Sequence, residues 1–149
     1  MSAIFGILRF DGADASAGDM ERMGEILAHR GPDGRAFSVI GHMGLGHCLM
    51  RVNQEDVFEA QPIRDDAADL MLVADARIDN REELAEACSI SEAALREMPD
   101  SALVLHACKK WGDDAAKHLL GDFAFAIWDG RTRRLLLGRD PMGQRSLHY

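Results

Sequence analysis

Two apolar runs separated by a turn dipeptide, close to the carboxyl-terminal end of the sequence, constrain the fold most. Large and small side chains alternate from Phe123 to Trp128, and a second apolar run, Leu135-Leu136-Leu137, follows. Asp129-Gly130 lies between the two runs, and Asp-Gly favours tight hairpin turns. The pattern therefore predicts a β-hairpin and, with it, antiparallel strand pairing.

Other runs have the composition of buried strands, because they are rich in apolar residues and end at turn residues. They are Ile4 to Phe10, Ala36 to Ile40, Gly44 to Val52 and Leu70 to Ala74. Gly41-His42 stands between the second and third of these runs and predicts another hairpin. The stretch from Asn53 to Asp69 is polar and irregular, which predicts a long loop.

Helical spacing of apolar residues appears between these strands. Asp19 is the candidate cap of a first helix, which ends before Pro32 because proline lacks a backbone N–H. Asn80 and Ser91 are candidate caps of two short helices. Ser101 begins a longer helix, in which an apolar stripe extends from Leu103 to Trp111.

Strands at both ends of the chain, with helices grouped between them, predict an α+β layered sandwich. We expect the strands Ile4–Phe10 and Phe123–Trp128 to be central in a sheet, and the Leu103–Trp111 helix to pack on it. The chain has 149 residues and contains no internal repeat or low-complexity segment. It is therefore expected to form a single domain, residues 1–149.

Charge and apolar content exclude several classes of protein. The formal net charge is −8, from 25 acidic and 17 basic residues. No basic tract offsets this charge, which argues against binding to nucleic acid or to an anionic membrane. No apolar run approaches the roughly 20 residues of a membrane helix, and the amino terminus does not have the pattern of a signal peptide. We therefore expect a cytoplasmic protein.

No metal site or phosphate-binding loop is predicted. His42, His47 and Cys48 are close in the sequence, but in a strand His47 and Cys48 would point to opposite faces. The cysteines Cys48, Cys88 and Cys108 are widely spaced and odd in number, which favours buried, reduced thiols. No cofactor is therefore expected in this domain.

A set of short strings in a fixed order spans nearly the whole chain and resembles the class II glutamine amidotransferase domain of asparagine synthetases. The strings are Ile4-Phe5-Gly6-Ile7, His29-Arg30-Gly31-Pro32-Asp33, Gly46-His47, Gln61-Pro62, Gly121-Asp122-Phe123-Ala124-Phe125-Ala126 and Arg139-Asp140-x-x-Gly143. The resemblance implies a four-layer αββα sandwich of the amino-terminal-nucleophile type. Within it, Gly31-Pro32 is expected to fix a turn, and Arg139 and Asp140 to pair.

The resemblance also implies which residue would attack glutamine. In the family a cysteine thiol, assisted by its own α-amino group, attacks the side-chain amide after the initiator methionine is removed. The matching position here is Ser2, followed by Ala3 where the family has glycine. A serine hydroxyl is far less acidic than a thiol, and while Met1 is retained the α-amino group is not on Ser2.

The residues that would bind glutamine have changed as well. The family's arginine for the glutamine carboxylate is Leu49 here, and Arg51, two residues on, lies about 7 Å away along a strand. The family's oxyanion-hole Asn-Gly pair is Asp75-Ala76, which places a carboxylate where negative charge develops. Asp100, which matches the family's ligand for the glutamine amine, is retained. We therefore predict that the glutamine-hydrolysing machinery has been lost.

The resemblance implies that such a domain covers a synthetase domain that uses ATP and Mg²⁺ to form an amide bond. The Ser-Gly-Gly-x-Asp-Ser loop of that domain does not occur in these residues. The expected partner is thus a synthetase domain of the same or another chain. The amine could be free ammonia, an amine within the substrate as in β-lactam synthetases, or the amino terminus of a precursor peptide as in lasso-peptide macrolactam synthetases.

Two alternatives stay open on the sequence alone. One is a non-enzymatic binding or assembly module, for which a homodimer is one arrangement. The other is an active amidotransferase that uses Ser2, because serine nucleophiles do work in other amino-terminal-nucleophile enzymes.

Overall fold

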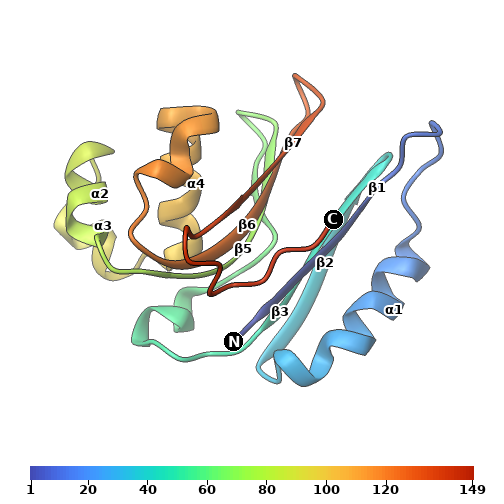
Figure 1. Cartoon of the computed structure of the whole chain (residues 1–149), viewed down its shortest axis with the longest axis horizontal. Helices are drawn as coiled ribbons and strands as arrows, with labels where there is room; N and C mark the ends of the chain where they lie inside the picture. Colours follow the sequence, from blue (N-terminus) through green and yellow to red (C-terminus); the bar gives the residue numbers. More distant parts are fainter.

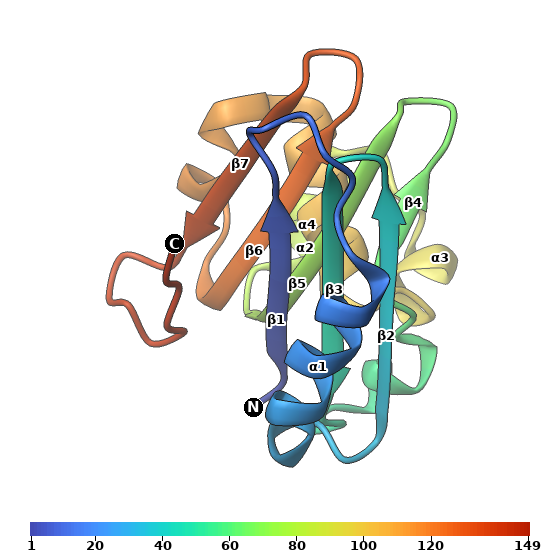
Figure 2. The ribbon, with the colours of Figure 1, turned by 90° about the vertical axis from the view of Figure 1, so that its right-hand side faces the viewer.

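Two antiparallel sheets lie face to face in the computed structural model, which describes all residues, 1–149 (Figures 1 and 2). The first sheet consists of β1 (Ala3–Leu8), β3 (Met43–Leu49) and β2 (Gly34–Ile40), in that spatial order. The second consists of β4 (Ile63–Asp65), β5 (Leu70–Ile78), β6 (Gly121–Asp129) and β7 (Arg134–Arg139), in sequence order.

Helices cover the outer face of each sheet. Helix α1 (Ala17–Leu27) packs on the first sheet, and α4 (Asp100–Trp111) packs on the second beside α2 (Arg81–Ala87) and α3 (Glu92–Arg96) (Figure 1). The 3-10 helices are η1 (Ala28–Arg30), η2 (Gln54–Phe58) and η3 (Gly112–Lys117). The α+β, four-layer αββα architecture expected from the sequence is confirmed.

The alternation along β6 separates two hydrophobic clusters. Phe123, Phe125 and Ile127 point to α4, in a cluster with Leu103 and Val104. The intervening side chains point to the other sheet, where Ala126 and Trp128 pack with residues of β3 and β5. The same period of two along β5 places Leu72 toward α4, and Met71 and Val73 toward the first sheet. The polar residues of the site described below lie at the ends of this inter-sheet layer.

Both predicted hairpins are confirmed. Gly41-His42 joins β2 to β3, whose last and first residues, Ile40 and Met43, pair directly. In the hairpin of β6 and β7 the loop is longer than the predicted dipeptide, because Asp129 pairs with Arg134. The Asp129 carboxylate accepts hydrogen bonds from two backbone N–H groups of the loop, those of Arg131 and Thr132, at 2.9 and 3.2 Å. These bonds stabilise the longer loop.

The predicted helices are present, but the first begins at a different cap. Ser16, not Asp19, caps α1, and its hydroxyl oxygen accepts the backbone N–H of Asp19 at 3.2 Å. A cap side chain reaches the amide three residues ahead, and Asp19 is that third residue. Ser91 caps α3 as predicted, by accepting from the backbone N–H of Ala94.

The prediction of one long loop over residues 53–69 was wrong. The segment contains η2 and β4, and β4 pairs with β5 through Ile63 and Leu72. β4 is only three residues long and carries Arg64 and Asp65, so neither its length nor its composition indicates a strand.

The expectation that both Ile4–Phe10 and Phe123–Trp128 are central strands was wrong for the first. β6 lies between β5 and β7, but β1 is at the edge of its sheet, beside β3 alone. Its apolar composition reflects cover on both faces, since Phe5 packs in the cluster under α1 and Ile4 packs between the sheets. Both faces of a strand can be buried even when only one of its edges is paired with another strand. The strand also ends at Leu8, and Phe10 is 91% exposed.

No helix is both long enough and apolar enough to cross a lipid bilayer.

The cavity beside Ser2 and the predicted glutamine pocket

Ser2 immediately precedes β1 and is 8% exposed. Its hydroxyl oxygen accepts the backbone N–H of Met50 at 3.0 Å and lies 3.4 Å from the Met50 carbonyl oxygen, to which it donates. Met1 is ordered ahead of it, and its amino nitrogen contacts Met50 Sδ. The hydroxyl that matches the family's nucleophile therefore fastens the start of β1 to the residue after β3.

Asp75 and Ser2 line the same cavity, whose volume is about 220 Å³; we call it the Ser2 cavity. The alternation along β5 places Asp75 on the face that looks toward the first sheet. Arg30 and His148 also line the cavity. Arg145 Nη1 lies 3.5 Å from Asp75 Oδ2, and both side chains are largely buried.

The carboxyl group of Asp75 lies in this cavity, where burial and nearby charges act on its pKa in opposite directions. Burial raises the pKa of Asp75, while the positive charges of Arg145, the amino terminus and Arg30 act to lower it. The pair is not a close hydrogen-bonded one, because Arg145 Nε and Nη1 are buried without hydrogen-bond partners. The cavity therefore presents the Asp75 carboxyl group and the Ser2 hydroxyl, with cations around them.

A turn that follows β7 positions Arg145 next to Asp75. Asp140 is 2% exposed, and its carboxylate accepts the backbone N–H groups of Gln144 and Arg145 at 2.9 and 3.0 Å. Burial acts to raise the pKa of Asp140, but these N–H groups outweigh it and the pKa is lowered. The expected pair between Arg139 and Asp140 was wrong: Arg139 is exposed and forms no ion pair, since Asp140 points back into its own turn.

Leu49 and Arg51 line a different cavity from Ser2. That cavity, of about 500 Å³, lies beside β2 and also contains Asp33. Asp33 Oδ2 accepts the backbone N–H of Arg51 at 2.8 Å. Gly31, in the same turn, touches the backbone of β3 so closely that an added Cβ would come within 2.2 Å of the Cys48 carbonyl carbon. The Gly31-Pro32 turn is thus held against the end of β3.

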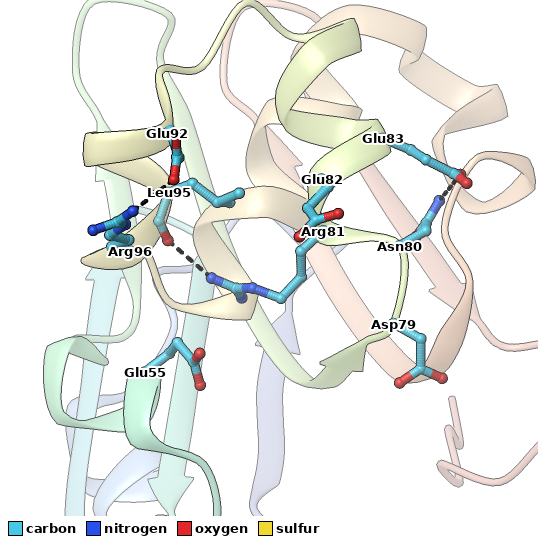
Figure 3. A pocket seen from close by; sticks show the side chains of 9 residues that line it. All are labelled: Glu55, Asp79, Asn80, Arg81, Glu82, Glu83, Glu92, Leu95 and Arg96. Carbon is cyan, nitrogen blue, oxygen red and sulfur yellow. Dashed lines mark hydrogen bonds and ion pairs between the residues drawn. The ribbon is translucent and has the colours of Figure 1, made fainter.

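Asp100 lies at the start of α4, and its carboxylate forms an ion pair with a neighbouring arginine. One carboxylate oxygen pairs with Arg81 Nη1, and the other accepts the backbone N–H of Ile78 at 2.9 Å. Arg81 also donates to the carbonyl oxygen of Leu95 at 3.1 Å (Figure 3). It donates to the carbonyl oxygen of Met98 at 2.7 Å. Burial raises the pKa of Asp100, against the lowering effects of the Ile78 N–H and Arg81.

The outer side of Arg81 borders a crevice of about 660 Å³ (Figure 3). Its acidic residues are Glu55, Asp79, Glu82, Glu83 and Glu92. The second arginine there, Arg96, pairs with Glu92 at 2.6 Å.

Ala76 points to the helical side of the second sheet, where it packs against the α4 cluster. Of the residues predicted from the family's site, only Ser2 and Asp75 share a cavity.

The side chains considered as metal ligands do not converge. His42 packs edge-on against Trp128 with ring centroids 5.3 Å apart, whereas Cys48 lies under α1. The structure contains no group of three or more His, Cys, Asp or Glu side chains with metal-binding geometry.

Sequence reasoning missed two residues that organise the site. Arg145 was missed because nothing local marks its partnership with Asp75. Gln61 was noted only as part of a motif, yet its side-chain amide makes paired hydrogen bonds with the Ala74 backbone, donating at 2.9 Å and accepting at 2.6 Å. Ala74 lies just beyond the part of β5 that pairs with β4, so this amide replaces a strand partner. The signal available in the sequence was the position of Gln61 directly before Pro62.

Comparison with known proteins decides the family. All residues, 1–149, match the family described as a glutamine amidotransferase domain. The chain belongs to this family. The amidotransferase domain is 33% identical over 146 residues to a putative glutamine-hydrolysing asparagine synthetase of Mycobacterium tuberculosis, covering 92% of this chain and 22% of that protein. It is the class II amidotransferase domain of the asparagine synthetase family.

Other relatives agree with this assignment. The amidotransferase domain is 32% identical over 133 residues to amidase chry2 of Gibberella zeae, covering 88% of this chain and 20% of that protein. It is 28% identical to asparagine synthetase 1 of Bacillus subtilis, over 87% of this chain and 20% of that protein. The chain thus spans about a fifth of the length of these relatives.

A solved structure confirms the fold. The glutamine phosphoribosylpyrophosphate amidotransferase of B. subtilis matches 97% of this chain and 38% of its own, with a TM-score of 0.71 and 19% sequence identity. The αββα sandwich of the amidotransferase domain is therefore of the amino-terminal-nucleophile type.

Proposed function

We propose that this domain does not hydrolyse glutamine, and that it serves as a structural domain of an ATP-dependent ligase that forms amide bonds. One observation carries the proposal: the Asp75 carboxylate lines the Ser2 cavity, paired with Arg145 at 3.5 Å. The position at which the family stabilises an oxyanion thus carries a negative charge.

Electrostatics at this position oppose the reaction. Attack on an amide carbonyl generates an oxyanion, and losing one stabilising donor typically costs about 10²–10³ in rate. A carboxylate repels the oxyanion, so the cost is larger still. The Ser2 hydroxyl is also engaged by the Met50 backbone, and no general base is hydrogen-bonded to it.

A glutaminase assay tests the proposal. Glutamine incubated with the purified domain should release no ammonia or glutamate above a heat-inactivated control. Ser2→Cys alone should restore nothing, because Asp75 and Leu49 remain in place of the oxyanion and carboxylate partners. Turnover well above the control, by either protein, would contradict the proposal.

The names of the relatives support a role in a larger amide-handling enzyme. Several are named asparagine synthetases, and two are named amidases. We infer that a separate synthetase domain uses ATP and Mg²⁺ to activate a carboxylate, and takes its amine from a source other than glutamine. Free ammonia, an amine within the substrate as in β-lactam synthetases, and a peptide amino terminus as in lasso-peptide macrolactam synthetases are the candidate sources.

A second candidate, amide hydrolysis by Ser2, is favoured only by the name amidase. Simple primary amides in the same assay distinguish it, because hydrolysis that disappears in Ser2→Ala would establish it.

The structural role rests on exposed apolar side chains in the segment that follows β3. Met50, Val52, Val57 and Phe58 are 39%, 69%, 61% and 46% exposed and belong to one stretch of chain. Burial of such side chains against a synthetase domain would stabilise both partners. The full-length protein and a version that starts after Tyr149 can be compared in ATP-dependent amide formation and in thermal unfolding. Equal stability and activity of the two would refute the structural role.

A further inference from the structure

A second cavity is bordered by Leu49 and shares no residue with the Ser2 cavity. Its volume is about 500 Å³, and it lies between β2, the end of β3 and the segment from Glu59 to Pro62. We call it the Glu59 cavity. The predicted chemistry of the family leaves this space without a role, apart from Leu49 at its border.

His47 contributes a buried ring nitrogen to the Glu59 cavity, and this nitrogen is an acceptor in the tautomer that carries its proton on Nδ1. Alternation along β3 places it on the same face as Met43 and Leu45, between the sheets, and it is 3% exposed. Burial lowers the pKa of His47 to about 4, against the opposing effect of Asp56, so the ring is neutral at pH 7. Its Nε2 atom is buried without a hydrogen-bond partner. An unpartnered buried polar atom is unfavourable, and a ligand that supplies the missing bond recovers that free energy.

Glu59 contributes a carboxylate that has no counter-ion. Its Oε1 accepts from the hydroxyl of Ser101, at the start of α4, at 2.6 Å. Arg35 and Arg51 line the same cavity, but Arg35 pairs with Glu21 at 2.5 Å and neither forms an ion pair with Glu59. Burial raises the pKa of Glu59, although hydrogen bonds from Ser101 and Gln61 act to lower it. Asp56 raises it further.

A buried ring nitrogen without a hydrogen-bond partner and a half-buried carboxylate without a counter-ion define the chemistry of the missing partner. A primary ammonium group has three N–H donors and a positive charge, and so satisfies both. We propose that the Glu59 cavity binds a primary ammonium group, which donates to the Glu59 carboxylate and to the His47 imidazole. The role of this site rests on the proposed function. If the domain releases no ammonia from glutamine, the enzyme needs another source of amine, and the Glu59 cavity would bind that amine.

Ligand titration of the purified domain tests the proposal. Ammonium chloride and glycinamide are added at fixed ionic strength, and the NMR signals of His47 and Glu59 are followed, with sodium chloride as the reference. We expect saturable shifts with at least one of the two amines. Saturation by ammonium chloride identifies free ammonium as a ligand, and saturation by glycinamide alone identifies the amine of a larger molecule. Saturation by neither overturns the proposal.

Matched variants and pH give two further controls. Glu59→Gln keeps an acceptor for Ser101 but removes the charge, and should weaken binding at least tenfold. Glu97→Gln removes an exposed charge elsewhere and should leave binding unchanged. In the unaltered domain, binding should strengthen as pH rises through the raised pKa of Glu59, because the ammonium needs an ionised carboxylate. The other charged groups that line the cavity are Asp33, Arg35 and Arg51. Asp56 acts on the Glu59 carboxylate from outside this lining.

Equal binding by Glu59→Gln, or binding that does not depend on pH in this direction, would refute the site. These results are independent of the glutaminase assay. Ammonia release from glutamine would contradict the proposed function and leave the amine site standing, whereas failure to bind amines would remove the site and leave the loss of glutaminase unaffected.

Discussion

The ion pair of Asp75 and Arg145 shows how a carboxylate can be accommodated in a largely buried position. A buried carboxylate without a counter-charge is strongly unfavourable, and Arg145 at 3.5 Å offsets part of that cost. The offset is incomplete, because Arg145 Nε and Nη1 lack hydrogen-bond partners. The pair is therefore better explained as accommodation of Asp75 than as a source of stability.

His47 should make the domain sensitive to acid. Its folded-state pKa, about 4, is below the ordinary value of 6.5, so its contribution to stability is present above pH 6.5 and is lost as pH falls toward 4. The loss amounts to at most about 3 kcal/mol. We expect His47→Gln to flatten the fall of the free energy of unfolding over this range, measured in urea at a series of pH values. His29→Gln, at an exposed histidine, should keep the slope of the unaltered domain.

The sequence could predict single residues of the site better than their grouping. Ser2 and Asp75 could be located by their neighbours in short motifs, and they do share a cavity. Leu49 and Asp100 could be located in the same way, but their surroundings depend on tertiary contacts: Leu49 faces the Glu59 cavity, and Asp100 is bound by Arg81. The roles assigned to these residues stay predictions until glutamine turnover is measured.

At the scale of elements, Arg81 joins the three helices of the second sheet. It lies at the start of α2, pairs with Asp100 of α4, and donates to the carbonyl oxygens of Leu95 and Met98 around the end of α3. Arg81→Leu would leave the Asp100 carboxylate buried with only one N–H partner. We expect a loss of about 3 kcal/mol or more in the free energy of unfolding in urea.

A control for this prediction is available on the neighbouring helix. Arg96 and Glu92 form an exposed pair, with side chains 75% and 81% exposed. Arg96→Leu should change the free energy of unfolding by about 0.5 kcal/mol or less. A loss in Arg81→Leu as small as that in Arg96→Leu would show that Arg81 does not hold the helices together.

Elements with a strong local pattern were predictable, and short or edge elements were not. The alternation in Phe123–Trp128 fixes both the strand and the sides its residues face, and the apolar stripe of Leu103–Trp111 fixes the helix that covers it. β4 has three residues and no pattern of its own, and it forms because β5 and the Gln61 amide offer partners. The edge position of β1 depends on which strands lie beside it. The residues of β1 alone carry no information about these neighbours.

At the scale of the whole molecule, an apolar groove runs beside β1 between the two sheets. It has a volume of about 520 Å³ and is lined by Ile4, Leu8 and Phe10, by Leu135 of β7 and by Tyr149. The chain end also lines this groove, through Leu147, His148 and Tyr149. Unpaired strand edges beside apolar surface promote association between molecules.

We therefore expect the 149-residue chain to self-associate, with an average mass that rises with concentration in sedimentation equilibrium. Phe10→Lys should shift this association to higher concentration, because Phe10 is 91% exposed at the groove and a charge there is repelled by its copy. Ile26→Lys changes an apolar residue that is 73% exposed on α1, away from the groove, and should have no effect. Equal association of all three proteins would place the contact elsewhere.

The one-sided pairing of β1 also has a consequence for amide hydrogen exchange. In an antiparallel pair, successive residues point their N–H groups alternately toward and away from the partner strand. β1 pairs only with β3, so every second amide along β1 has no strand to bond, while β3 is paired on both sides. Deuterium uptake should therefore alternate with a period of two residues in β1 and be uniformly slow in β3. If a further strand joins β1 in a longer form of the protein, the fast amides of β1 become slow, which reports the completed sheet without any assay of activity.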